Sequence, residues 1–186
     1  MPRSDLRFEA ENMLEMLSVF GHRHHYPPVF AMPVQATQRE RPYLVYFPSA
    51  STSAKCWPHA SFSALIKQMV LRYPDHDHIV LQGIAEWESV DGIMAAQHGR
   101  ANVIGMKLDD FDATVSLVKG AALLVGNDTG IRNIAIACET PTVGIFFITE
   151  VFRYWPRYGR HEAVFNQDGS VPSIEDVFAA ATRVLS

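Results

Sequence analysis

From residue 43 onward the chain alternates short apolar runs with stretches whose apolar residues recur at helical spacing, and this alternation restricts the fold most. The apolar runs predict strands at residues 43–47, 79–81, 102–104, 122–125 and 142–146. The stretches between and after them predict helices over 58–73, 87–97, 112–119, 131–138 and 173–185. Strands that are apolar throughout are buried on both faces. The pattern therefore predicts a doubly wound, Rossmann-like α/β domain with a parallel sheet.

The first 42 residues do not follow this pattern. Apolar residues from Leu6 to Phe20 recur at helical spacing, and Gly21 follows as a stop signal. Residues 22–42 contain four prolines, which predicts an extended strap. We therefore expect two parts: a helix and Pro-rich strap over residues 1–42, outside the main unit, and the Rossmann-like domain over residues 43–186.

Charge and cysteine content narrow the function classes. The net charge of -4 and the absence of a basic block argue against nucleic-acid binding and against more than peripheral contact with a membrane. The chain has only two cysteines, Cys56 and Cys138, which favours a reducing compartment. The N-terminus does not read as a signal peptide, and no run is long enough to span a bilayer. We expect a cytoplasmic protein.

The sequence Gly-Asn-Asp-Thr-Gly at residues 126–130 joins a predicted strand to the next helix. Free backbone N–H groups, the positive end of the helix dipole and a threonine hydroxyl meet at such a junction, which is an arrangement that binds phosphate. Gly126 and Gly130 let the backbone approach a ligand closely. The spacing is equally compatible with Asp128 or Thr129 acting only as a helix cap.

A second strand-to-helix passage, residues 47–58, is rich in hydroxyl groups and carries one lysine. Its serines and threonine supply hydrogen-bond donors and Lys55 supplies a positive charge, which together suit a diphosphate. It is not a P-loop, because the glycines are missing. A solvated loop with one surface lysine is the alternative. We expect Trp57 and Pro58 to pack at the helix start.

In this order, these segments resemble glycosyltransferase family 9, best known for the ADP-heptose:lipopolysaccharide heptosyltransferases. The resemblance rests on Phe47-Pro-Ser-Ala with Lys55-x-Trp57-Pro58, on residues 102–105 and 125–130, and on Thr140-Pro-Thr-Val143. It covers about residues 43–160, and the helix at 6–20 resembles the family's interdomain segment. The resemblance implies the C-terminal, donor-binding half of a two-domain GT-B glycosyltransferase, with a role in lipopolysaccharide biosynthesis.

The resemblance also implies a role for particular residues. Lys55, with Ser51 and Thr52 before it, would contact the phosphates of a nucleotide-sugar donor. At the helix start, Asp128, Thr129 and Gly130 would hold the diphosphate and the sugar.

The nucleoside of the donor would lie further along the same edge. Glu86 occupies the place of an acidic residue that binds the ribose, and Met106 lies near the expected nucleobase pocket. The family favours an ADP-sugar, with a UDP- or GDP-sugar as the alternatives, and no tightly bound cofactor.

The chain also departs from the family pattern. Asn133 stands where family members commonly have histidine, and Phe147 replaces a glycine after the fifth strand, where it would crowd a ligand. The family's acceptor site and proposed general base lie in a first half that precedes the interdomain segment, so no catalytic residue is assigned here. One interpretation is half of an inverting enzyme that needs a separate acceptor-binding polypeptide or another subunit, including a homo-oligomer. The other is a non-catalytic nucleotide-binding or interaction module.

Three other segments have alternative interpretations. The histidine-rich residues 22–25 and the acidic and histidine residues 75–78 contain metal-ligand types, but a solvated strap and a polar turn account for them, so we expect no metal site. The aromatic and basic residues 153–158 would either close over a sugar or form a packed crossing segment.

Overall fold

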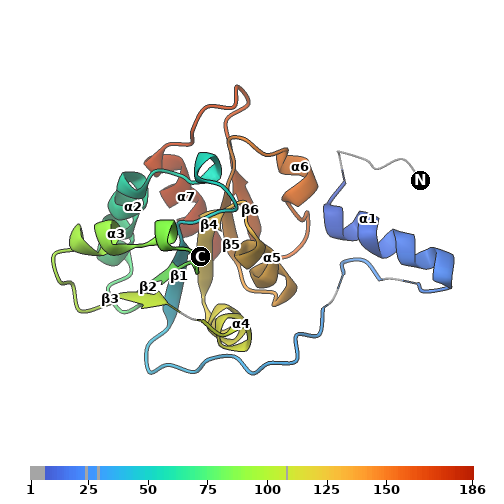
Figure 1. Cartoon of the computed structure of the whole chain (residues 1–186), viewed down its shortest axis with the longest axis horizontal. Coiled ribbons are helices and arrows are strands. Elements are labelled where there is room, and N and C mark those ends of the chain that lie inside the picture. Colours follow the sequence, from blue (N-terminus) through green and yellow to red (C-terminus); the bar gives the residue numbers. More distant parts are fainter. Residues whose placement is uncertain (1–6, 24, 29, 108) are drawn as a thin grey trace.

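The computed structural model describes residues 7–23, 25–28, 30–107 and 109–186. These residues form a six-stranded sheet in the order β3-β2-β1-β4-β5-β6, with all neighbouring strands parallel (Figure 1). The strands are β1 (Tyr43–Phe47), β2 (Asp77–Gln82), β3 (Val103–Lys107), β4 (Leu123–Asn127), β5 (Thr142–Ile145) and β6 (His161–Val164). The predicted doubly wound α/β fold is confirmed.

Helices cover both faces of the sheet. One face packs against α2 (His59–Arg72), α3 (Asp91–Ala95) and α7 (Ile174–Leu185), and the other against α4 (Phe111–Gly120) and α5 (Gly130–Ala137). Strand β1 is buried along its whole length, with Leu44 and Tyr46 facing the first layer and Val45 facing the second. Each face of the sheet thus forms its own apolar core, which explains why the strands read as uninterrupted apolar runs.

The predicted helix over residues 87–97 is wrong in its first half. A 3₁₀ turn occupies Glu86–Glu88, and α3 begins only at Asp91. The Glu88 side chain turns back to accept the backbone N–H of Ala85 at 2.9 Å, which closes the turn on itself. The side-chain oxygen of Ser89 then accepts the N–H of Asp91 at 3.2 Å, so the chain begins a new helix there.

Two further differences concern strands. Strand β6 was not predicted, because its central residues Glu162 and Ala163 are half-exposed at the edge of the sheet and form no apolar run. Strand β2 begins at Asp77, earlier than predicted, since Asp77 and His78 pair with Tyr43 and Leu44 of β1.

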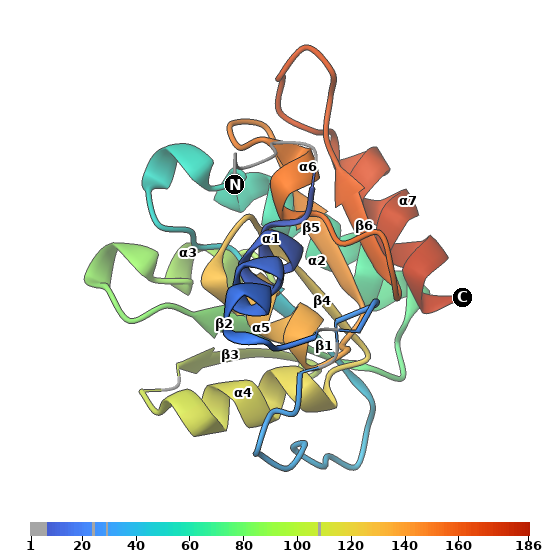
Figure 2. The same ribbon diagram turned by 90° about the vertical axis from the view of Figure 1, so that its right-hand side faces the viewer.

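The N-terminal helix lies outside α5, on the side away from the sheet (Figures 1 and 2). It consists of α1 (Glu9–Met16) and a 3₁₀ turn (Leu17–Phe20), and it stops at Gly21, whose φ is +81°. The start of the predicted helix, Leu6, lies outside the described residues, as does His24 of the histidine-rich segment.

The Pro-rich strap runs back from this helix along α4 to β1 (Figure 1). The Lys119 ammonium donates to the carbonyls of Met32 at 3.1 Å and Val34 at 2.8 Å, and the Thr37 N–H donates to the Ser116 carbonyl at 2.9 Å. The strap is therefore held to the domain through hydrogen bonds made by its own backbone groups.

None of the helices in the described part of the chain has both the length and the apolar character that a membrane crossing requires. Cys56 and Cys138 carry free thiols.

Candidate functional site

The strand order reverses between β1 and β4, because the chain runs outward from β1 to β2 and β3 on one side and from β4 to β5 and β6 on the other. Open parallel sheets bind ligands beyond the carboxyl ends of their strands at such a reversal. Phe47 pairs with Gly126, so the loops after β1 and β4 leave the sheet at the same level. Both ligand-binding segments expected from the sequence therefore lie side by side at this point.

Asn127, the last residue of β4, is completely buried and holds the loop that follows β1. Its Oδ1 accepts the backbone N–H of Trp57 at 2.9 Å, and its Nδ2 donates to the Pro48 carbonyl at 2.7 Å. Trp57 is fully buried and donates from Nε1 to the Pro172 carbonyl at 2.9 Å, so its packing at the helix start is confirmed. The loop that carries Lys55 is thus pinned to β4 at both ends.

Within the described part of the chain, no side chain caps the start of α5. Thr129 occupies the cap position with φ -152° and ψ 162°, but its hydroxyl makes no capping hydrogen bond. A Cβ added at Gly130 would meet no atom within 4 Å, so the space in front of the first helical turn is open. The interpretation of Thr129 as only a side-chain cap is therefore wrong. Its free hydroxyl and the first N–H groups of α5 remain as hydrogen-bond donors.

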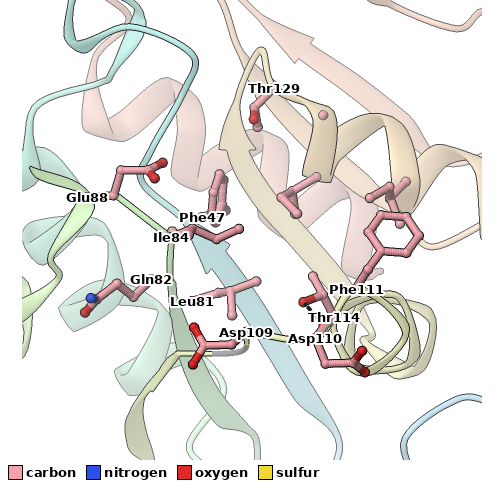
Figure 3. A pocket seen from close by; sticks show the side chains of 14 residues that line it. Phe47, Leu81, Gln82, Ile84, Glu88, Asp109, Asp110, Phe111, Thr114 and Thr129 are labelled. Atoms are coloured by element: carbon pink, nitrogen blue, oxygen red, sulfur yellow. Dashed lines mark hydrogen bonds between the residues drawn. The ribbon is translucent and has the colours of Figure 1, made fainter. Parts of the chain in front are cut away.

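A cavity of about 380 Å³ lies beside this helix start (Figure 3). Apolar side chains that line it come from the strands, with Phe47 and Leu81, and from α5, with Ile131 and Ile134. Small-molecule sites occupy roughly 300–1,000 Å³ and combine apolar walls with a few polar groups. The polar lining residues are Gln82, Glu88, Asp109, Asp110, Thr114 and Thr129. This combination suits a ligand with a flat apolar part and several hydroxyl groups.

Of the two acidic residues in the 3₁₀ turn after β2, Glu88 lines this cavity, whereas Glu86 is exposed and lies outside the lining. The Glu88 carboxylate lies directly against Gly83, where a Cβ would collide with it. Its Oε2 is held by the N–H of Ala85. The 3₁₀ turn therefore brings Glu88 to the cavity instead of the acidic residue that precedes it by two positions.

Of the other expected site residues, only Thr129 and Gly130 line the cavity. Met106 lies in β3 and packs against the apolar cluster to which the lining residues Phe47 and Leu81 belong. Ser51, Thr52 and Lys55 lie on the pinned loop, with the first two exposed and Lys55 half-exposed at the end of a 3₁₀ turn. Asp128 lies between β4 and α5 and is half-buried.

Arg132, in the first turn of α5, is fully buried. One of its terminal nitrogens donates to the Tyr154 carbonyl at 2.8 Å, and its guanidinium lies 4.9 Å from the ring centroid of Phe146. Its Nε and Nη2 have no hydrogen-bond partner among the described residues. Burial lowers the pKa of Arg132 to about 10, although the nearby Asp128 carboxylate opposes this effect.

The two departures from the family pattern lie away from the cavity. Asn133 is exposed on α5, and Phe147 packs partly against the core on the other side of the helix start. Phe147 does not line the cavity, so it does not crowd a ligand there.

The aromatic and basic residues 153–158 form a packed crossing segment, as one of the two interpretations expected. It includes the end of α6 (Val151–Tyr154). Trp155 donates from Nε1 to the His161 carbonyl at 2.8 Å, and the Tyr158 ring lies 6.0 Å from that of Phe8 beside α1.

Two of the candidate metal ligands at residues 75–78, Asp77 and His78, have other partners. Asp77 pairs with Arg39 at 3.1 Å, and His78 is buried in β2 against Tyr46. The described residues contain no group of three or more histidine, cysteine or acidic side chains that could hold a metal ion.

Comparison with known proteins identifies relatives of this arrangement. The family description glycosyltransferase family 9 (heptosyltransferase) matches residues 8–178. Lipopolysaccharide heptosyltransferase 2 of Escherichia coli (strain K12) is 30% identical over 112 residues, covering 58% of this chain and 31% of that protein.

Solved structures share the fold. Escherichia coli ADP-heptose lipopolysaccharide heptosyltransferase II superposes with a TM-score of 0.68 at 21% identity, covering 80% of this chain and 47% of that one. An Escherichia coli heptosyltransferase solved with ADP gives a TM-score of 0.67 at 17% identity, covering 80% and 46%. The chain thus spans about half the length of these solved relatives. At these identities the likeness establishes the fold, a Rossmann-like half of the GT-B type.

Proposed function

The chain belongs to glycosyltransferase family 9, and we propose that residues 43–186 bind the nucleotide-sugar donor of an inverting, heptosyltransferase-like reaction. The observation that carries the proposal is the uncapped start of α5, which opens beside an apolar cavity at the point where the strand order reverses. A helix start of this kind binds phosphate, and the cavity beside it has the volume and lining of a nucleoside site.

In this proposal the diphosphate lies at the start of α5. The hydroxyl of Thr129 and the N–H of Gly130 donate to it, and Lys55 supplies the positive charge from the pinned loop with Ser51 and Thr52. The same donors would stabilise the charge that develops on the leaving nucleoside diphosphate during transfer.

The nucleoside lies in the cavity. Glu88 accepts hydrogen bonds from the ribose hydroxyls, a role that the family resemblance implies for Glu86, because Glu88 is the acidic residue of that turn that lines the cavity. Phe47, Leu81 and the isoleucines of α5 contact the base, and Met106 packs against the same apolar cluster. An ADP-sugar is the favoured donor, since one solved relative was determined with ADP and another is named for ADP-heptose.

Catalysis requires a base that deprotonates the acceptor hydroxyl, and the resemblance assigns none to this chain. We therefore propose that transfer takes place in the cytoplasm, after an acceptor-binding half of the same fold completes the site. The competing function is a non-catalytic nucleotide-binding module. Asn133 favours that alternative, because it replaces the histidine that the family commonly has at this exposed position of α5.

The test is a thermal-shift titration of the chain with ADP, UDP and GDP and then with the corresponding nucleotide sugars. A ligand at about 100 times its Kd adds roughly 2.7 kcal/mol of stability, which raises Tm by several degrees. Lys55→Ala should lose most of this rise, whereas the matched control Lys67→Ala, in the middle of α2, should keep it.

A rise with one base that depends on Lys55 would support the donor site and identify the nucleobase. No rise with any of the nucleotides would contradict the proposal.

A further inference from the structure

A second cavity, of about 490 Å³, lies at the carboxyl ends of β5 and β6. Its walls are residues 146–152, which include the start of α6, and residues 165–167 and 169, which follow β6. These two segments lie at the same end of the sheet as the loops of the first cavity (Figures 1 and 2). None of the residues assigned above to donor binding lines it.

The strand register fixes where this cavity lies relative to the start of α5. Asn127 pairs with Ile145, and Ile145 pairs with Val164, so β4, β5 and β6 end at the same level. Neighbouring strands are about 4.8 Å apart. The start of α5, which follows β4, therefore lies between the first cavity on one side and the second cavity on the other.

The second cavity is lined by aromatic rings. Phe147, Phe152 and Phe165 contribute to it, and the rings of Phe152 and Phe165 meet edge to face with centroids 6.3 Å apart. The Arg157 guanidinium lies 5.4 Å from the Phe152 centroid, which helps to fix that ring. Phe152 nevertheless remains 39% exposed, so part of its surface is available to a ligand.

Uncharged and acidic polar groups also line this cavity. They are Thr149, Glu150, Asn166 and Gln167, and no lysine or arginine among the described residues belongs to the lining. Asn166 donates its amide N–H to the Ser170 hydroxyl at 3.0 Å, which fixes the plane of the amide. The lining thus offers acceptors for hydroxyl groups, and the positive charge beside it, the Arg157 guanidinium, faces the Phe152 ring.

A sugar ring matches this lining, because it has an apolar face of C–H groups that packs on aromatic rings and a rim of hydroxyls that donate to carboxylate and amide oxygens. A phosphate or another anion matches it less well, since the polar residues that line it are acidic or neutral. We infer that the second cavity binds a sugar ring, and that Phe152 is the aromatic surface on which the ring packs.

This inference rests on the proposed function, because a nucleotide sugar whose diphosphate lies at the start of α5 and whose nucleoside lies in the first cavity would extend its sugar toward the second. The sugar has two sources, the glycosyl group of the donor and the acceptor saccharide. Both present the same chemistry to the cavity, and they are separated by experiment.

The test compares Phe152→Ala with wild type in calorimetric titrations of ADP and ADP-heptose, alongside the pairs UDP and UDP-glucose and GDP and GDP-mannose. If the donor's sugar occupies the cavity, Phe152→Ala should weaken the nucleotide sugar roughly tenfold and change the nucleoside diphosphate by less than about twofold. Phe152→Tyr, which keeps the ring, should restore binding. Phe20→Ala is the matched control, since Phe20 is 78% exposed and lies beside α1.

A second arm uses saturation-transfer NMR with free heptose and with a core oligosaccharide released from lipopolysaccharide. Unchanged nucleotide-sugar binding together with loss of the saccharide signal in Phe152→Ala would support the cavity and assign it to the acceptor. The inference is overturned if Phe152→Ala changes neither the nucleotide-sugar affinity nor the saccharide signal. It is also overturned if wild type gives no saccharide signal and binds the nucleoside diphosphate and the nucleotide sugar with equal affinity.

Failure of the proposed function gives a different result. Wild type would then bind none of the three nucleotides, while the saccharide arm would still report on the second cavity directly.

Discussion

The side-chain oxygen of Asn127 accepts the backbone N–H of Trp57 at 2.9 Å, across a separation of 70 residues in the chain. This bond joins the end of β4 to the loop that carries Lys55, while the Asn127 amide donates to the Pro48 carbonyl at the other end of the same loop. One buried side chain thus fixes the position of the proposed phosphate-binding lysine relative to the start of α5.

Asn127→Ala should therefore lower both stability and nucleotide affinity. It leaves the Trp57 N–H and the Pro48 carbonyl without their partner in the protein interior, and each unsatisfied buried group costs about 1–3 kcal/mol. We expect the free energy of unfolding, measured with urea, to fall by about 2–4 kcal/mol. The control Asn133→Ala removes an exposed amide from α5 and should change it by less than about 0.5 kcal/mol. Equal midpoints for the two variants would contradict the role of Asn127.

Glu88 and Glu86 form a matched pair, because both belong to the same 3₁₀ turn and only Glu88 lines the first cavity. Glu88→Gln keeps an oxygen that accepts the Ala85 N–H but removes the charge available to ribose hydroxyls. We expect a nucleoside diphosphate to bind roughly tenfold more weakly, as loss of a charge-assisted hydrogen bond implies. Glu86→Gln should leave the Kd unchanged in the same titration. The opposite ranking would return the ribose-binding role to Glu86.

Gly130→Ala separates ligand binding from folding. A Cβ at Gly130 meets no protein atom, so the substitution causes no clash and should stabilise the helix, by up to about 1 kcal/mol. The added methyl group would, however, occupy the space where the proposed diphosphate approaches the backbone. We expect a higher Tm without ligand and a smaller thermal shift with nucleotide. An unchanged shift would mean that the phosphate does not bind in front of this helix.

Strands that are buried on both faces could be predicted from the sequence, whereas a half-exposed edge strand could not. Strands such as β1 and β4 are buried on both faces, and their apolar runs were recognised in the sequence. Strand β6 was missed because an edge strand with a half-exposed Glu162 lacks that signal. The helix predicted from residue 87 was wrong because the bond from Ala85 to Glu88 competes with helical hydrogen bonds, and periodicity does not report such a bond.

The sequence predicts which loops form the site better than it predicts which residues in and around them act there. The loops that carry Lys55 and residues 128–130 were identified because each follows a strand, and the register of β1 with β4 brings them together. Asn127 was missed because its partners are remote in sequence. An amide at the end of an otherwise apolar strand was the one signal available for it.

Two buried histidines should make stability depend on pH. His78 accepts the Tyr46 hydroxyl hydrogen on Nδ1 at 2.9 Å, with Nε2 donating to the Tyr73 carbonyl at 3.2 Å, and the Nδ1 of His161 lies 3.0 Å from the Thr142 hydroxyl. Burial lowers the pKa of each histidine from 6.5 to about 4. The unfolded chain therefore binds more protons than the folded one between these two values.

The contribution of the two neutral histidines to the free energy of unfolding is therefore complete above pH 6.5, and it is lost as the pH falls toward 4. Each histidine should cost on the order of 3 kcal/mol by pH 4, measured as the loss of unfolding free energy in urea titrations from pH 7.5 downward. His161→Gln retains a partner for Thr142 without a titrating group, and its curve should be flatter over this range. A curve as steep as that of wild type would show that His161 does not contribute.

The buried Arg132 guanidinium should lower the stability of the fold. An apolar side chain of similar length at this position should remove that loss. Arg132 is fully buried, its guanidinium has one hydrogen bond to the Tyr154 carbonyl and a face on Phe146, and its Nε and Nη2 lack partners among the described residues. Arg132→Met preserves most of the packing without the charge, so we expect stability to be unchanged or to rise by about 1–3 kcal/mol. Arg132→Ala leaves a cavity against Phe146 and should cost about 2–4 kcal/mol. If Arg132→Met is as damaging as Arg132→Ala, the guanidinium itself is stabilising, and an acidic or anionic partner for it must be sought, beginning with Asp128.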